Sequence, residues 1–153
     1  MRATAVLSCA VLLLACGGSE TPPPDTAAAV PAPAPAPTIS LADVAGKWTQ
    51  VTRRENSDSV LVTSEVVATA DTTGWTITLP GRKPEPVRVR VDGDSIMTSA
   101  GPYASVLRKG AQVTTEGVVR LQGGKMVGTS IARYTGGGAD SVVRFRTEAT
   151  RAP

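Results

Sequence analysis

Histidine is absent from the sequence, and cysteine and aromatic residues are scarce, with two Cys, two Trp, two Tyr and one Phe in 153 residues. Without an imidazole the chain contains neither a Ser-His-Asp nor a Cys-His nucleophile system, and no histidine-ligated zinc, copper or haem site. We therefore predict a non-catalytic protein with no catalytic residue, no metal and no other cofactor. The composition suits one small domain joined to disordered segments.

The first residues have the pattern of a bacterial export signal. Met1 and Arg2 give a positive start, a largely apolar run extends to Leu14, and Gly17 interrupts it. A membrane-spanning helix needs about 20 apolar residues, so this run is too short to span a bilayer.

A cysteine follows the apolar run, in the motif Leu13-Leu14-Ala15-Cys16. The motif resembles the lipobox of bacterial lipoproteins, in which the cysteine receives the lipid. The resemblance implies that residues 1–15 are a signal peptide, that Cys16 is linked to diacylglycerol and that its new amino group is acylated. An anchor of two or three acyl chains holds a protein permanently on a membrane.

The same resemblance predicts the location of the protein. In that family the absence of Asp after the cysteine favours the outer membrane, and Gly17 stands at this position. We therefore expect a lipid-anchored protein of the cell envelope, in the outer membrane, with the membrane as a partner through Cys16. Because Cys9 leaves with the signal, the mature chain has no disulfide.

Most of the chain's 12 prolines fall between residues 17 and 37, and they end in an alternating Pro-Ala run. Such a segment lacks the bulky apolar side chains that folding requires. We predict that residues 16–40 are the lipidated cysteine and a disordered tether. If the tether follows polyproline II at about 3.1 Å per residue, its reach is roughly 65 Å.

From residue 41 to residue 153, apolar and polar side chains alternate, and Val and Thr are frequent. Period-two alternation indicates half-buried antiparallel strands. We predict at most one helical turn at 41–45 and strands near residues 46–54, 59–70, 74–80, 86–92, 94–100, 103–107, 111–122, 125–135 and 140–150. The domain at 41–153 is therefore all-β, an antiparallel meander of about eight or nine strands that covers its edges as a small barrel, an open barrel or a sandwich.

Gly-rich and Asp-rich clusters separate these strands. Gly123-Gly124 lacks the spacing of a phosphate-binding loop. Asp92-Gly93-Asp94 offers two carboxylates, whereas calcium takes about six to eight oxygen ligands. We interpret both clusters as hairpin turns.

Gly46-Lys47-Trp48 opens the first predicted strand. It resembles the Gly-x-Trp signature of lipocalins and related small barrels, which implies a lipocalin-like barrel. In that family the Trp closes one end of the barrel beneath an Arg of the last strand, a place that Arg144 or Arg146 could take. The domain is shorter than a usual lipocalin, so we expect a shallow or open barrel.

The leading functional hypothesis is non-catalytic binding of a small apolar or amphipathic ligand, with Trp48, Trp75 and Ile77 as the candidate lining, because ligand sites are mostly apolar. The alternative is a structural or envelope-interaction module with a filled core and no ligand. A third hypothesis, a carboxylate hydrolase, requires a facing pair among Glu55, Glu65, Glu116 and Glu148.

Two arginine pairs, Arg88 with Arg90 and Arg144 with Arg146, are spaced so that both members of a pair face the same side of a strand. They form either a solvated outer face or a cationic strip for anionic lipid headgroups or cell-wall polymers.

No aromatic side chain shares a strand face with these arginines to stack on bases, so we expect no nucleic acid partner. We also expect a monomer.

Overall fold

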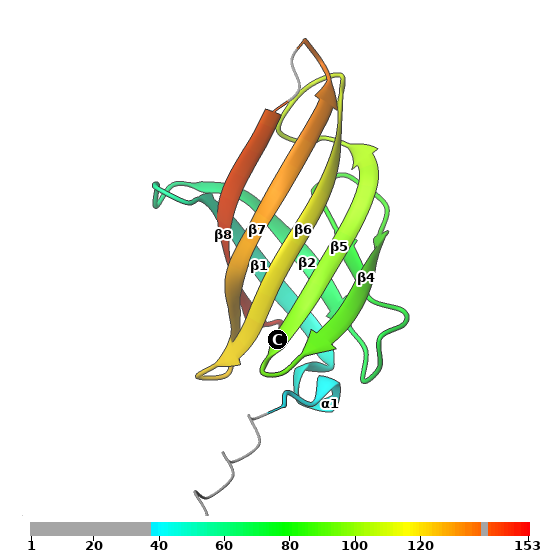
Figure 1. The fold of residues 1–153 in the computed structure, drawn as a ribbon, viewed down its shortest axis with the longest axis vertical. Coiled ribbons are helices and arrows are strands. Elements are labelled where there is room, and N and C mark those ends of the chain that lie inside the picture. Colours follow the sequence, from blue (N-terminus) through cyan, green and yellow to red (C-terminus); the bar gives the residue numbers. More distant parts are fainter. Residues whose placement is uncertain (1–37, 139–140) are drawn as a thin grey trace, which may run out of the picture. The chain divides into compact units, whose positions relative to one another are not determined.

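The structure, a computed structural model, describes residues 38–138 and 141–153, which form a closed barrel of eight antiparallel strands (Figure 1). Its elements are α1 (Leu41–Val44), β1 (Gly46–Arg54), β2 (Val60–Ala68), β3 (Thr76–Thr78), β4 (Glu85–Asp92), β5 (Ser95–Ala104), β6 (Ala111–Gln122), β7 (Lys125–Gly136) and β8 (Ser141–Arg151). The predicted signal peptide, Cys16 and the predicted tether up to residue 37 lie outside the described residues.

The all-β prediction is confirmed, and the strand number is eight. Two strands that the sequence separated, near 94–100 and 103–107, are the single strand β5. The pairing of β5 with β6 shifts register between Ala100 and Tyr103, where Gly101 has a φ of 103° and precedes Pro102. A bulge accommodates a proline inside a strand, so the break predicted between residues 100 and 103 does not occur.

The barrel is closed, so of the small barrel, the open barrel and the sandwich predicted from sequence, the small barrel is confirmed, and the open form that the short domain favoured does not occur. β1 and β8 pair from Trp48 opposite Arg151 to Arg54 opposite Phe145. Each strand thus has a neighbour on both sides, although the short β3 pairs only with residues 65–67 of β2 and residues 85–86 of β4, so the rest of these two strands is paired on one side only. Ala34–Pro153 is one compact unit of the chain, and its described residues contain all eight strands of the ring.

Local sequence explains the hairpins that order the ring. Between β6 and β7, Gly123 and Gly124 have φ values of 57° and 78°. A two-residue turn with positive φ at both positions matches the twist of the flanking strands, and glycine adopts it without strain. The hairpin interpretation of this Gly pair is therefore confirmed.

Inward-facing side chains form two buried clusters. The closed-end cluster consists of Leu41, Val44, Trp48, Val66, Ala68, Trp75, Ile96, Met126 and Ala149. The open-end cluster consists of Ala111, Val113, Ala132, Tyr134 and Phe145. The prediction that most of the few aromatic residues belong to the core is confirmed, since Trp48, Trp75, Tyr134 and Phe145 are all buried.

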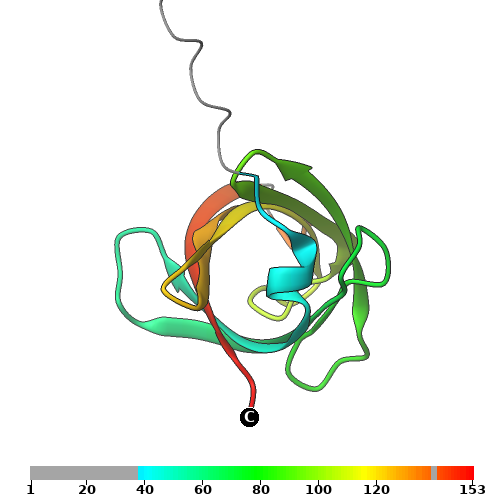
Figure 2. The same ribbon diagram turned by 90° about the horizontal axis from the view of Figure 1, so that it is seen from below.

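Helix α1, the one helix among the described residues, closes one end of the barrel. Seen from below, α1 lies across the ring of strands (Figure 2), and Leu41 and Val44 point into the closed-end cluster. Ile39, assigned to the tether from sequence, already belongs to the barrel, because its amide donates to Gly93 O at 3.0 Å and its side chain packs on this cluster. The described chain therefore enters at the same end as the C-terminus.

Candidate functional site

The barrel interior holds a cavity of about 130 Å³, lined by residues of both clusters. Every lining residue is uncharged. Toward the closed end the lining is apolar, with Val66 and Trp75, and toward the open end it includes Tyr103 and Tyr134. An interior of this kind favours a neutral occupant, because an unpaired charge loses its hydration there without compensation.

Hydroxyl and amide side chains lie midway along the cavity. On β1, Gln50 lies opposite Ser64 and Thr52 lies opposite Thr147, and all four line the cavity. Residues directly opposite each other in an antiparallel pair share a face of the sheet, so the register gathers these polar groups between the two apolar clusters.

Ser64 is the most informative member of this polar belt. Its side chain is 5% exposed, and its Oγ is the one buried side-chain polar atom in the described part of the chain that has no hydrogen-bond partner. A buried hydroxyl without a partner costs about 1–3 kcal/mol. An occupant that offers a donor or an acceptor to Oγ would offset this cost.

A glycine keeps space open in the wall at the same level. Gly117 lines the cavity and lies opposite Thr98 on β5 and Ser130 on β7. A Cβ at Gly117 would stand 2.8 Å from Thr98 Oγ1 and 3.3 Å from Thr129 O. A larger residue at Gly117 would therefore require the Thr98 side chain to move.

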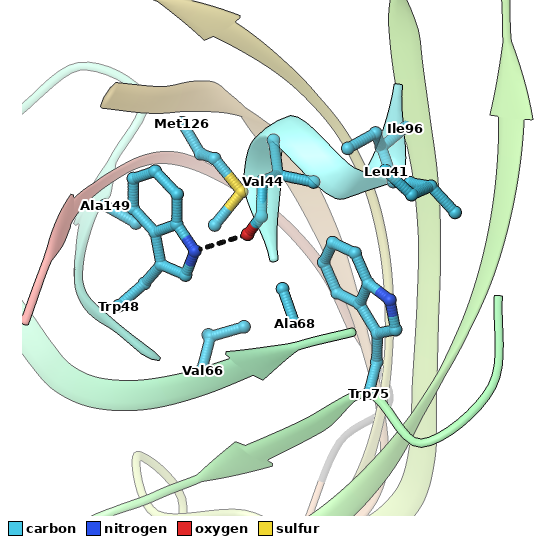
Figure 3. Packing of buried hydrophobic residues seen from close by; sticks show 9 residues of the cluster. All are labelled: Leu41, Val44, Trp48, Val66, Ala68, Trp75, Ile96, Met126 and Ala149. Atoms are coloured by element: carbon cyan, nitrogen blue, oxygen red, sulfur yellow. Dashed lines mark hydrogen bonds between the residues drawn. The ribbon is translucent and has the colours of Figure 1, made fainter. Parts of the chain in front are cut away.

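Trp48 forms the floor of the closed end. Its indole is fully buried, and its Nε1 donates to Val44 O at 2.8 Å, which ties the first strand to the end of α1 (Figure 3). Met126 and Ala149 pack in the same cluster. The indole satisfies a helix carbonyl that has no partner within the helix.

An arginine of the last strand covers this tryptophan, but it is Arg151 and not Arg144 or Arg146. The Arg151 guanidinium lies 4.5 Å from the Trp48 ring centroid and donates to Ala45 O at 2.9 Å and to Asp43 O at 2.6 Å. Pairing of Trp48 with Arg151 across β1 and β8 places the two side chains on one face. Arg144 and Arg146 have the opposite parity on β8 and are exposed on the outer wall.

The three predicted ligand-contacting residues separate into two groups. Trp75 and Ile77 line the cavity, whereas Trp48 is in the floor and not in the lining. Sequence reasoning missed Ser64, although it shares the parity of Val62 and Val66 and so had to face inward. A lone serine within an apolar stripe was the available signal.

A hydrogen-bonded loop orients Trp75. Its Nε1 donates to Asp71 O at 2.8 Å. The Asp71 carboxylate accepts from the Thr73 hydroxyl and the Thr73 amide, both at 2.7 Å, and these bonds hold the pKa of Asp71 below its usual range. Such a bond from a backbone amide two residues on is typical of an Asx-turn.

The open end carries two tyrosines and an arginine. Arg108 stacks over the Tyr134 ring at 4.3 Å and donates to Ser141 Oγ. Burial raises the pKa of both Tyr103 and Tyr134. Ser105 Oγ accepts from the amides of Leu107 and Arg108 at 3.1 and 2.9 Å, which fixes the loop between β5 and β6.

The other predicted side chains lie on the outer wall. The Arg88 and Arg144 pairs are on β4 and β8, which are separated by three strands whichever way the ring is followed, so they do not form one strip. Arg146 contacts Asp58 at 3.0 Å. Two further ion pairs lie on the outside of the barrel: Arg133 Nη2 is 3.6 Å from Glu116 Oε2, and Lys125 Nζ is 3.0 Å from Glu148 Oε1.

The hydrolase hypothesis required two carboxylates facing each other in a cleft. The interior cavity is lined by no carboxylate, and two shallow outer hollows contain at most one, Glu148. At the Asp92-Gly93-Asp94 turn, Asp94 accepts from Ser95 and from Arg120, which hold its pKa below the usual range.

Within residues 38–138 and 141–153 no three metal-ligating side chains cluster. Across the same ranges, no helix has the length and apolar character needed to cross a membrane. The chain matches no family model, and neither a curated protein nor a solved structure shows significant similarity to it.

Proposed function

We propose that this chain is a lipid-anchored lipoprotein of the cell envelope whose lipocalin-like barrel binds one small, uncharged, amphipathic molecule in its interior. The anchor follows from the Leu13-Leu14-Ala15-Cys16 motif, and Gly17 favours the outer membrane. The observation that carries the binding function is the interior cavity, with its uncharged lining and the unpartnered Ser64 Oγ.

The cavity volume limits the size of the ligand. At about 130 Å³ it is smaller than the usual range for ligand sites, which begins near about 300 Å³. A cavity of about 150 Å³ is known to hold benzene. The ligand is therefore a short chain or a single ring, and a large cofactor does not fit.

The lining also limits the chemistry of the ligand. Apolar ends favour a hydrocarbon body, and the uncharged interior disfavours a carboxylate or an amine. Ser64 Oγ can accept or donate one hydrogen bond, so the ligand carries a neutral polar group such as a hydroxyl, a carbonyl or an ether oxygen.

We expect 1-hexanol to bind residues 38–153 and hexanoate not to bind, as measured by the rise of the thermal unfolding midpoint with ligand concentration. Ser64→Ala should weaken hexanol about fivefold, which corresponds to one hydrogen bond, and should leave benzene unchanged because benzene offers none. Ser59→Ala, at an exposed serine, is the matched control.

A second variant tests the cavity itself. Ala100 is buried and lines the cavity, so Ala100→Leu fills the space and should abolish binding of both probes in a barrel that still unfolds cooperatively. If Ala100→Leu binds hexanol as the wild type does, the molecule occupies another place and the proposal is wrong.

The small volume also supports the alternative, a structural or interaction module without a ligand. Native mass spectrometry of the protein isolated from its host distinguishes the two. A discrete added mass that disappears in Ala100→Leu supports the binder, and a bare chain that also ignores hexanol and benzene supports the structural module.

A further inference from the structure

The exposed large apolar side chains of the described residues gather at the open end of the barrel. They are Val60, Val106, Leu107 and Val142, with exposed fractions of 53, 37, 41 and 58%. Val60 begins β2, Val142 is near the start of β8, and Val106 and Leu107 are in the loop between β5 and β6. We call this end, with the β5–β6 loop and the connection from β3 to β4, the open rim.

Unpaired cations flank the apolar loop. Arg82 and Lys83 lie in the connection from β3 to β4, and Lys109 is two residues after Leu107. All three are exposed, and none forms an ion pair within the described ranges. Arg82, Val106, Leu107 and Lys109 line one shallow hollow, whose lining includes no carboxylate. The two connections are thus neighbours in space.

We propose that the open rim docks on an anionic lipid surface, with Val106 and Leu107 entering the headgroup boundary and Arg82, Lys83 and Lys109 contacting lipid phosphates. Apolar side chains combined with nearby cations give interfacial binding that depends on anionic lipid. Val106 and Leu107 also line the interior cavity, but docking uses their exposed surface and the three cations, so it does not require a ligand in the cavity.

The loop is held in the conformation that docking needs. Ser105 Oγ accepts from two amides of the loop, and Arg108 is fixed by the Tyr134 ring and by Ser141 Oγ. Val106 and Leu107 are therefore held exposed by contacts on their own loop and on β7 and β8. The loop therefore loses little further conformational freedom on binding, and the entropy cost of docking is small.

The anchor does not prevent this orientation. The Ile39 amide is hydrogen-bonded to Gly93 O at the closed end, opposite the rim, so the chain enters the barrel there. The longest strands contain 12 residues and span about 40 Å. The expected tether reach of roughly 65 Å exceeds that length, so the rim can contact the leaflet that carries the anchor.

Residues 38–153, which lack Cys16, can be tested for co-sedimentation with vesicles of phosphatidylcholine alone or mixed with phosphatidylglycerol. We expect binding to the mixed vesicles only. Arg82→Ala with Lys109→Ala should weaken it about 20-fold, because each cation near an anionic surface contributes several-fold. The matched control, Arg88→Ala with Arg144→Ala, removes two exposed wall cations and should bind as the wild type does.

Insertion is measured by Leu107→Trp, whose added emission should shift to the blue and be quenched by brominated lipid in mixed vesicles. Val106→Ser with Leu107→Ser should lose binding to the mixed vesicles while the barrel keeps its cooperative thermal unfolding; the hexanol response does not serve as this control, because both residues also line the interior cavity. Equal binding to both vesicles, or greater loss in the wall variant than in the rim variant, overturns the proposal. So does a concentration-dependent dimer that the serine variant abolishes, because the rim would then cover a second copy.

Discussion

The closed end of the barrel depends on Arg151, and truncation of this side chain tests how it is closed. Arg151→Ala removes the guanidinium that lies over the Trp48 ring and donates to Asp43 O and Ala45 O. These carbonyls are at the end of α1, where the helix itself supplies no partner. The substitution therefore removes the hydrogen bonds that join β8 to the end of α1.

The magnitude follows from these contacts. Two hydrogen bonds from a charged donor contribute about 1 kcal/mol each at an exposed site, and the cation–π contact contributes about 0.5–1 kcal/mol. Because Arg151 is exposed, water can hydrogen-bond to the two carbonyls in the variant and offsets part of the loss. We expect the free energy of unfolding to fall by about 2 kcal/mol and the midpoint temperature by about 5–10 °C.

Urea unfolding of residues 38–153, followed by tryptophan emission, measures this change, since Trp48 and Trp75 are both buried. Arg151→Lys keeps the charge without the planar fork and should fall between the wild type and Arg151→Ala. Arg144→Ala removes an exposed arginine of the same strand and should cost less than about 0.5 kcal/mol. If Arg151→Ala costs no more than Arg144→Ala, the closing role assigned to Arg151 is wrong.

Two further predictions concern the anchor and the loop beside Trp75. Metabolic labelling with a clickable fatty acid should mark the wild type and leave Cys16→Ala unlabelled; equal labelling of the two would refute lipidation at Cys16. Because hydrogen bonds from Thr73 lower the pKa of Asp71 from 3.8 in the folded chain, its carboxylate stabilises the fold at higher pH, and the effect is lost as the pH falls through the lowered value. The gap in thermal midpoint between wild type and Asp71→Ala should therefore be constant from about pH 5 to 7 and narrow below about pH 4; a gap that widens on acidification would contradict this role.

Strands and turns were predictable because their signals are local. Alternation along 111–122 and 125–135 gave two strands within one residue of their observed bounds, and Gly123-Gly124 gave the turn between them. The helical turn before Gly46 was also predictable. Only where a bulge kept Pro102 inside a strand did the local signal give the wrong break.

The sequence by itself also determined which side chains face inward, since side-chain direction alternates along each strand. The tertiary structure decided what those side chains meet. Closure depends on register between the first and last strands, which places Arg151 rather than Arg144 over Trp48. The same register gathers the polar belt and leaves Ser64 Oγ without a partner, because pairing across the ring joins residues far apart in the chain, and no local pattern specifies it.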